Sequence, residues 1–361
     1  MGFVGKNLVT ALLRRDDVAV STCTRNDDQS MLEAALVQAD IIFHLAGVNR
    51  PEHEQEFASG NTGLTQDIVQ YLQEQGRFPK IILPSSTQAA LDNPYGKSKK
   101  AAEDALLDYN SSTGGAVAVY RLPGVFGKWS QPNYNTVVAT FCHNIARGLD
   151  ISISNPEYEL ELVYIDDVVA EFLRHLDGHF DRQRYTVPRT FRVTLGDLAE
   201  RIQQLHAIRE SLMIPNLADD LTKCLYATYL SFVPDDNFSS PVLMHNDERG
   251  WLFELIKSEH FGQIFVSKTL PGITRGDHYH DTKLEKFCVI QGQGIIRFRH
   301  VHCNDIIEYP VNDTAITVVD IPPGYTHSIE NNGNTEMICL FWANQVFNPE
   351  APDTFWEKVK G

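Results

Sequence analysis

The chain has 361 residues, more than one hydrophobic core usually organises, so we expect two domains. Its formal charge of −16 at pH 7 argues against a nucleic-acid partner, because phosphate backbones require clustered Lys and Arg. No run of 18 apolar residues and no secretory signal pattern occurs, so the sequence predicts no membrane association. Six scattered cysteines without a CxxC pair favour a reducing compartment, and we expect a cytoplasmic protein.

The first two-thirds of the chain alternate short apolar runs with helical stretches. The sequence predicts strands and helices, in chain order, at residues 18–23, 28–38, 41–45, 61–75, 80–83, 95–109 and 116–120. Near-continuous apolar strands that alternate with helices are typical of a parallel sheet covered on both faces. The pattern therefore predicts an α/β domain.

The pattern changes after about residue 232. Residues 231–241 are rich in turn formers and predict an interdomain linker. Strand-like runs separated by Gly, Pro and Asn then follow, at residues 263–270, 286–290, 294–300 and 315–321. We therefore predict an α/β domain over residues 1–233 and an all-β sandwich or barrel over residues 234–361.

Gly2 and Gly5 resemble the end of a glycine-rich turn that leads into a helix, where backbone N–H groups bind pyrophosphate. Two glycines at this spacing are weak evidence, because many surface turns share it. The strand and first glycine that should precede them are absent from the chain. We expect either a chain that starts late or a first domain that has lost part of its cofactor site.

Asn93 and Pro94 predict the start of a helix that places Tyr95 and Lys99 on one face. A phenol ionises near pH 10, and a neighbouring ammonium favours the phenolate and brings its pKa toward the range useful for acid–base catalysis. The same spacing also arises by chance on helix surfaces.

With its neighbours, this pair resembles the extended short-chain dehydrogenase/reductases. Ser86 at a strand end, Tyr95 and Lys99 match that family's serine and YxxxK layout, and Asn61 matches its helix asparagine. The resemblance implies that Ser86 bonds the substrate carbonyl and that Tyr95 donates the proton. It also implies that Lys99 holds the cofactor ribose and tunes the tyrosine.

The segment His44-Leu45-Ala46-Gly47 matches the HLAG-like strand end beside the cofactor in the same family. The resemblance implies that Ala46 and Gly47 contact the cofactor, together with Gly2 and Gly5. Arg25 lies where NADP-preferring members place a base for the 2′-phosphate, which implies NADPH. The nearby acidic residues 27 and 28 keep NADH open.

The predicted all-β domain contains two histidine segments, residues 272–292 and 322–331. Alternate residues of a strand share a face, and three imidazoles with a carboxylate suit Zn²⁺ or another divalent transition metal. The segments resemble the two motifs of the cupin family, GxxxxxHxHxxxxExxxxxxG and PxGxxHxxxN. The resemblance implies a jelly-roll barrel with four metal ligands: His278, His280, Glu285 and His327.

Residues 245–254 and 275–280 also resemble the DxRGxFxE and RGxHYQ segments of dTDP-sugar 3,5-epimerases. In that family, the histidine at the position of His278 takes a proton next to a keto group. A metal ligand cannot freely do both, so the identity of the base stays open.

The domain order, with residues 51–53, 92–96, 132–135 and 297–301, resembles the bifunctional UDP-sugar epimerase/reductases of capsular polysaccharide synthesis. The resemblance implies C3 epimerisation of a UDP-2-acetamido-2,6-dideoxy-4-hexulose in the second domain. NADPH-dependent C4 reduction in the first domain would then give UDP-2-acetamido-2,6-dideoxy-L-talose, in a homodimer. Two alternatives stay open: a cupin-only epimerase with a scaffolding first domain, and a non-catalytic regulator that binds metal or sugar nucleotide.

Overall fold

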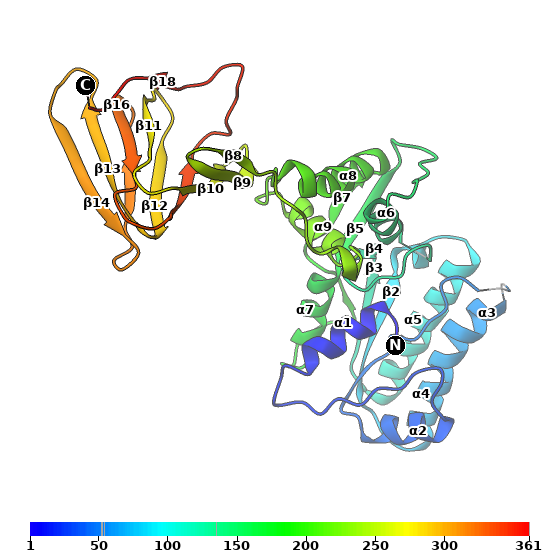
Figure 1. Cartoon of the computed structure of the whole chain (residues 1–361). Coiled ribbons are helices and arrows are strands. Elements are labelled where there is room, and N and C mark those ends of the chain that lie inside the picture. Colours follow the sequence, from blue (N-terminus) through cyan, green and yellow to red (C-terminus); the bar gives the residue numbers. More distant parts are fainter. Residues whose placement is uncertain (52, 54, 135, 361) are drawn as a thin grey trace. The chain divides into compact units, whose positions relative to one another are not determined.

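The computed structural model describes residues 1–51, 53, 55–134 and 136–360 (Figure 1). Residues 52 and 135, which belong to the segments 51–53 and 132–135 named in the sequence analysis, lie outside the described ranges. The chain forms two compact units. The first comprises Met1–Gln203 and Cys224–Pro234, and the second comprises Gln204–Lys223 and Asp235–Gly361. The division between residues 233 and 234 stays a prediction.

The first unit is built on a parallel sheet whose strand order is β1-β2-β3-β6. Its strands are β1 (Ile41–Phe43), β2 (Lys80–Ser86), β3 (Val117–Leu122) and β6 (Arg184–Tyr185). The helices around it are α1 (Phe3–Leu12), α2 (Gln29–Gln38), α3 (Gln55–Phe57), α4 (Leu64–Glu74), α5 (Pro94–Thr113) and α7 (Ile165–Arg174). The predicted alternation of strands and helices is confirmed at every segment except residues 18–23.

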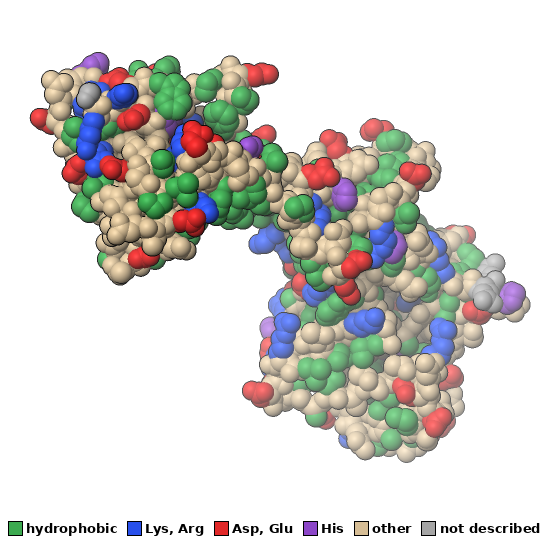
Figure 2. All heavy atoms as spheres, viewed as in Figure 1, with side chains coloured by type: hydrophobic (Ala, Val, Ile, Leu, Met, Phe, Trp, Pro, Cys, Tyr) green, Lys and Arg blue, Asp and Glu red, His purple; other side chains and the backbone are tan. Residues whose placement is uncertain are grey.

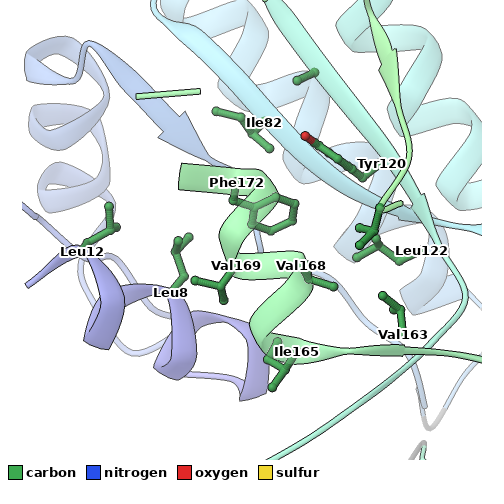
Figure 3. Close-up of a cluster of buried hydrophobic side chains, with 12 residues drawn as sticks. Leu8, Leu12, Ile82, Tyr120, Leu122, Val163, Ile165, Val168, Val169 and Phe172 are labelled. Carbon is green, nitrogen blue, oxygen red and sulfur yellow. The ribbon is translucent and has the colours of Figure 1, made fainter. Parts of the chain in front are cut away.

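Both faces of this sheet are covered by helices, as predicted. Side chains of β2 and β3 alternate between two buried clusters, because neighbouring strand residues point to opposite faces. Leu8 of α1 and Phe172 of α7 pack on one face, with Ile82 and Tyr120 (Figure 3). Residues of α2, α4 and α5 pack on the other, with Ile81 and Leu83.

The prediction of a strand at residues 18–23 is wrong. This segment forms no ladder with a neighbour, although Val18 and Val20 pack against the cluster that includes Phe172. Among the described residues, β1 is the outermost strand on its side of the sheet. A strand exists only by pairing, so apolar alternation alone does not produce one.

A second, three-stranded sheet completes the first unit, with order β4-β5-β7. The remaining elements are β4 (Gly124–Phe126), α6 (Val137–Ala146), β5 (Glu159–Tyr164), β7 (Phe191–Thr194), α8 (Leu195–Ser211) and α9 (Asp220–Leu230). Helix α8 ends and α9 begins in residues assigned to the second unit. In the part of the chain that the structure describes, no helix has the length and apolar character of a membrane span.

The second unit contains two antiparallel sheets, which confirms the prediction of an all-β region. Their orders are β15-β12-β17-β10-β9-β8 and β14-β13-β16-β11-β18. The elements are η3 (Asp235–Asn237), β8 (His245–Asp247), β9 (Gly250–Ser258), β10 (Gly262–Thr269), β11 (Thr274–Tyr279), β12 (Glu285–Gln291), β13 (Gln293–His300), β14 (Ile306–Asn312), β15 (Val318–Ile321), β16 (Tyr325–Glu330), β17 (Met337–Ala343) and β18 (Phe355–Trp356). Buried residues from strands of both sheets form one apolar core.

Acidic and basic side chains are scattered over the visible face of each unit (Figure 2).

Candidate functional site

Helix α5 begins where the sequence predicts and carries Tyr95 in its first turn. The Asn93 side chain accepts a hydrogen bond from the Gly96 N–H at 2.7 Å, and Pro94 occupies the first turn. Lys99 follows one turn later, with its Nζ 5.9 Å from the centroid of the Tyr95 ring. The first turns of this helix therefore bring the two predicted catalytic residues together.

Lys99 is 7% exposed, and burial lowers its pKa to about 8. Gly47, in the segment after β1, lies against it. A Cβ added at Gly47 would stand 3.1 Å from Lys99 Nζ and 2.8 Å from Asn61 Oδ1. Only a glycine lets the backbone approach the buried ammonium this closely.

Asn61 joins the segment after β1 to helix α5. It lies in a π-helical turn, η1 (Ala58–Gly63), where the sequence predicts ordinary helix. Its Oδ1 accepts from the Val48 N–H at 2.9 Å, and its Nδ2 donates to the Val48 carbonyl at 3.0 Å. The same Nδ2 lies 3.0 Å from Ser98 Oγ on α5. Insertion of one residue into a helical turn at a functional site is a known use of π-helices.

The Tyr95 hydroxyl donates to Asn49 Oδ1 at 3.0 Å. Burial raises the pKa of Tyr95 and exceeds the lowering effect of the hydrogen bond with Ser86. The expectation that the Lys99 ammonium brings this pKa down is therefore wrong, because burial raises the pKa and the group that lowers it is Ser86. The phenol keeps its proton at neutral pH, which is the form a proton donor requires.

Ser86 is the last residue of β2, and its Oγ accepts from the Gln88 N–H at the start of η2 (Thr87–Ala90). Its neighbour Ser85 points elsewhere and donates to the buried carboxylate of Glu103 at 2.5 Å. Glu103 is in turn paired with Arg121 at 2.7 Å. Of the two serines, Ser86 is the one beside Tyr95, as predicted.

The other predicted cofactor residues are placed less closely together. Gly2 precedes α1 in an extended conformation, and a Cβ at Gly5 would lie 3.7 Å from the Leu45 side chain. The start of α1 thus adjoins the segment that carries Ala46. Arg25 is exposed, and no hydrogen bond or ion pair joins it to the other predicted cofactor residues within the described ranges.

In the second unit, the structure brings together all four predicted metal ligands. His278 lies on β11, Glu285 opens β12 and His327 lies on β16, while His280 directly follows β11. One ligand atom from each residue lies within 4.8 Å of the others. His280 Nε2 is 3.2 Å, and His327 Nε2 is 3.4 Å, from Glu285 Oε2.

A β-bulge aims His278 at this cluster. The register between β11 and β16 shifts between Gly276 and His278, and Asp277 adopts a φ of +62°. Gly276 has a φ of +100°, and a Cβ there would stand 2.7 Å from the His327 carbonyl oxygen. The rings of His278 and His327 consequently lie 4.6 Å apart.

Backbone carbonyls orient two of the imidazoles. His280 Nδ1 donates to the Asp353 carbonyl, and His327 Nδ1 lies 3.2 Å from the Tyr325 carbonyl. Each contact leaves Nε2 facing Glu285. Among the described residues, His278 Nδ1 and His327 Nε2 are buried without a hydrogen-bond partner. Such unpaired nitrogens are costly, and a metal ion would satisfy a donor set of this kind.

The electrostatics also fit a divalent cation. Burial by itself would raise the pKa of Glu285, but the neighbouring His280 and His327 outweigh it and hold that pKa well below its ordinary value. Burial lowers the pKa of His278 to about 4. At neutral pH the cluster therefore contains a carboxylate and a neutral imidazole, the forms that bind metal.

Sequence reasoning missed Asn49 and Asp353. Asn49 is 46 residues from Tyr95, and Asp353 is 73 residues from His280. Neither belongs to a motif used in the sequence analysis, so nothing local identifies them.

Two family models match the chain. Residues 1–187 match the NAD dependent epimerase/dehydratase family, and residues 245–355 match the polysaccharide biosynthesis C-terminal domain.

Similar proteins cover nearly the whole chain. UDP-2-acetamido-2,6-beta-L-arabino-hexul-4-ose reductase of Pseudomonas aeruginosa is 43% identical over 98% of this chain and 95% of its own length. The crystal structure of the capsular polysaccharide assembling protein CapF from Staphylococcus aureus is 46% identical, with a TM-score of 0.93 over 99% of this chain and 98% of that one. UDP-glucose 4-epimerase of Thermotoga maritima shares only the fold, at 19% identity and a TM-score of 0.52 over 64% of this chain and 96% of that one. The chain therefore belongs to the NAD dependent epimerase/dehydratase family, in the group of two-part proteins that includes this UDP-sugar reductase and CapF.

Proposed function

We propose that the chain is a bifunctional nucleotide-sugar enzyme. Its second unit epimerises C3 of a UDP-2-acetamido-2,6-dideoxy-4-hexulose, and its first unit reduces the C4 keto group with NADPH. The product is UDP-2-acetamido-2,6-dideoxy-L-talose. The observation that carries the proposal is the buried Lys99 beside a protonated Tyr95, in a chain 43% identical over its length to a UDP-4-ketosugar reductase.

In the reductase site, Tyr95 gives its phenolic proton to the C4 oxygen, and Ser86 donates a hydrogen bond to the same oxygen. The Tyr95 hydroxyl must leave Asn49 Oδ1 to do so. When bound, NADPH supplies the hydride. The residues that would hold it are Gly2, Gly5, Arg25, Ala46, Gly47, Tyr95 and Lys99. The Lys99 ammonium carries the positive charge that favours transfer of the phenolic proton.

In the second unit, we propose a cupin-type barrel with zinc or a similar cation held by His278, His280, Glu285 and His327. The two antiparallel sheets and the convergence of these four side chains support this assignment. When bound, the metal would polarise the 4-keto group and acidify the C3 proton. The base that removes this proton stays open, because each histidine of the cluster is a candidate ligand.

One functional group of the substrate serves both sites. The C4 ketone acidifies the C3 proton and also accepts the hydride, so reduction traps the epimerised configuration. We further propose a homodimer that pairs through edge strands of the second unit. Exposed apolar side chains on β14 and β15 support this pairing, namely Ile306, Ile307 and Val318.

The test separates the two reactions. The 4-ketosugar is incubated with the protein in deuterated water without NADPH, and deuterium at C3 is measured by NMR. NADPH is then added, and its oxidation is followed by absorbance. We expect C3 exchange in the first step and NADPH oxidation in the second. Exchange without NADPH binding would instead identify a cupin-only epimerase. The absence of both reactions would indicate a regulator.

A further inference from the structure

One residue near the chain end, Asp353, bonds the loop that connects two of the four candidate metal ligands. This loop, residues 281–284, runs from His280 at the end of β11 to Glu285 at the start of β12. The Asp353 carboxylate accepts from the backbone N–H groups of Asp281, Thr282 and Lys283 at 2.9, 2.8 and 2.7 Å, and from Thr282 Oγ1 at 2.8 Å.

The backbone of the same residue binds a ligand directly. The Asp353 carbonyl accepts from His280 Nδ1, so His280 presents Nε2 to Glu285. The side chain thus fixes the loop on one side of the histidine, and the carbonyl fixes the tautomer and orientation of its ring.

Independent contacts hold the segment after Asp353 against β11. Trp356 of β18 pairs with His278, and the Glu357 N–H donates to the Asp277 carbonyl at 2.9 Å. The Val359 N–H donates to Asp277 Oδ1 at 3.1 Å, and Arg299 bonds Glu357 at 2.6 Å. The chain around Asp353 is therefore anchored on a strand that carries a ligand.

The electrostatics agree with this bonding. Burial would raise the pKa of Asp353, but its hydrogen bonds with residues 281–283 outweigh burial and hold the pKa well below its ordinary value. The carboxylate is thus ionised throughout the neutral range.

We infer that Asp353 is a positioning residue for the metal centre. It sets the orientation of His280 and the path of the loop between His280 and Glu285. This inference rests on the proposed metal site. Asp353 touches no candidate ligand through its side chain, so its effect is exerted through the loop and through its own carbonyl.

The test compares zinc affinity in full-length variants by competition with a chromogenic chelator. Asp353→Ala keeps the backbone carbonyl but releases the loop, and we expect about 10–100-fold weaker zinc binding. Asp353→Asn keeps one acceptor oxygen and should bind zinc with intermediate affinity. The matched control is Asp313→Ala. The Asp313 carboxylate also accepts from a turn N–H, that of Gly292, at the far end of β12 from Glu285.

Circular dichroism and melting of the metal-free proteins check that each variant folds. If Asp353→Ala does not fold, Asp353→Asn carries the test, with an expected loss of about tenfold. Zinc affinity of the folded variant within about twofold of wild type would overturn the inference. Absence of zinc binding by the wild-type protein would instead overturn the proposed metal site itself.

Discussion

The two candidate sites bury charges of opposite sign. In the first unit, Lys99 is a buried ammonium, and burial lowers its pKa to about 8. In the second unit, Glu285 is a buried carboxylate surrounded by imidazoles. Each charge is complementary to the group its site would bind, an anionic dinucleotide in one case and a metal cation in the other. Each buried charge therefore lowers the free energy of unfolding of its unit until the complementary group binds.

Removal of the Tyr95 hydroxyl should give the largest difference between the activities of the two sites. Tyr95→Phe deletes the proposed proton donor and should lower kcat for NADPH oxidation by roughly 10²–10⁴-fold. C3 deuterium exchange should stay at the wild-type rate. The control is Tyr158→Phe, at an exposed position. An equal loss of exchange would contradict the independence of the two sites.

Loss of one metal-binding side chain should affect only the second unit. His327→Gln removes a buried imidazole and should weaken zinc binding by at least about 100-fold, beyond the range for outer contacts. Exchange at C3 should fall with it, whereas NADPH binding, measured by fluorescence titration, should not change. His302→Gln replaces an exposed histidine and serves as the control. If NADPH binding weakens as well, the comparison fails.

The cost of the buried cation can be measured directly. Lys99→Met removes the charge and should raise the free energy of unfolding at pH 7 by on the order of 3 kcal/mol, while reductase activity is lost. The pKa of Lys99 is lower in the folded chain than its ordinary 10.5, so the penalty is fully present below about pH 8 and disappears toward pH 10.5.

Urea unfolding at pH 7 and at pH 10 checks this prediction, and the gain should shrink at the higher pH. The control is Lys100→Met, because the Lys100 side chain is 42% exposed and paired with Asp104. A Lys99→Met protein no more stable than wild type at pH 7 would show that the burial of Lys99 has no cost.

The smallest effect is expected at Gly47. Gly47→Ala forces Asn61 or Lys99 to move by a few tenths of an ångström and should weaken NADPH binding by about tenfold, or about 1.4 kcal/mol. Gly63→Ala is the matched control, because its Cβ would meet only an ordinary contact at 3.7 Å. Equal NADPH affinity in both variants would remove Gly47 from the cofactor site.

Local signals predicted most of what the structure contains. The start of α5 follows from Asn93 and Pro94, and the metal cluster follows from motif spacing combined with the two-residue period of strands. The errors concern interactions across the chain. Residues 18–23 form no ladder, since pairing needs a neighbouring strand.

Other features could not be predicted from the sequence, for related reasons. The π-helical turn around Asn61 depends on its contacts with Val48 and Ser98, and the hydrogen bond of Tyr95 with Asn49 spans 46 residues. The direction of the Tyr95 pKa shift depends on how deeply the phenol is buried, which no spacing reveals.

The spacing of the histidines at the end of β11 has a consequence for how this protein can change by insertion and deletion. Alternate residues of a strand share a face, so deleting Tyr279 from between His278 and His280 would turn the two imidazoles to opposite faces. A substitution in this strand alters one side chain, whereas a gap in it would dismantle the ligand set. In an evolving lineage, length changes should therefore collect in the surface turns and leave Thr274–Tyr279 intact.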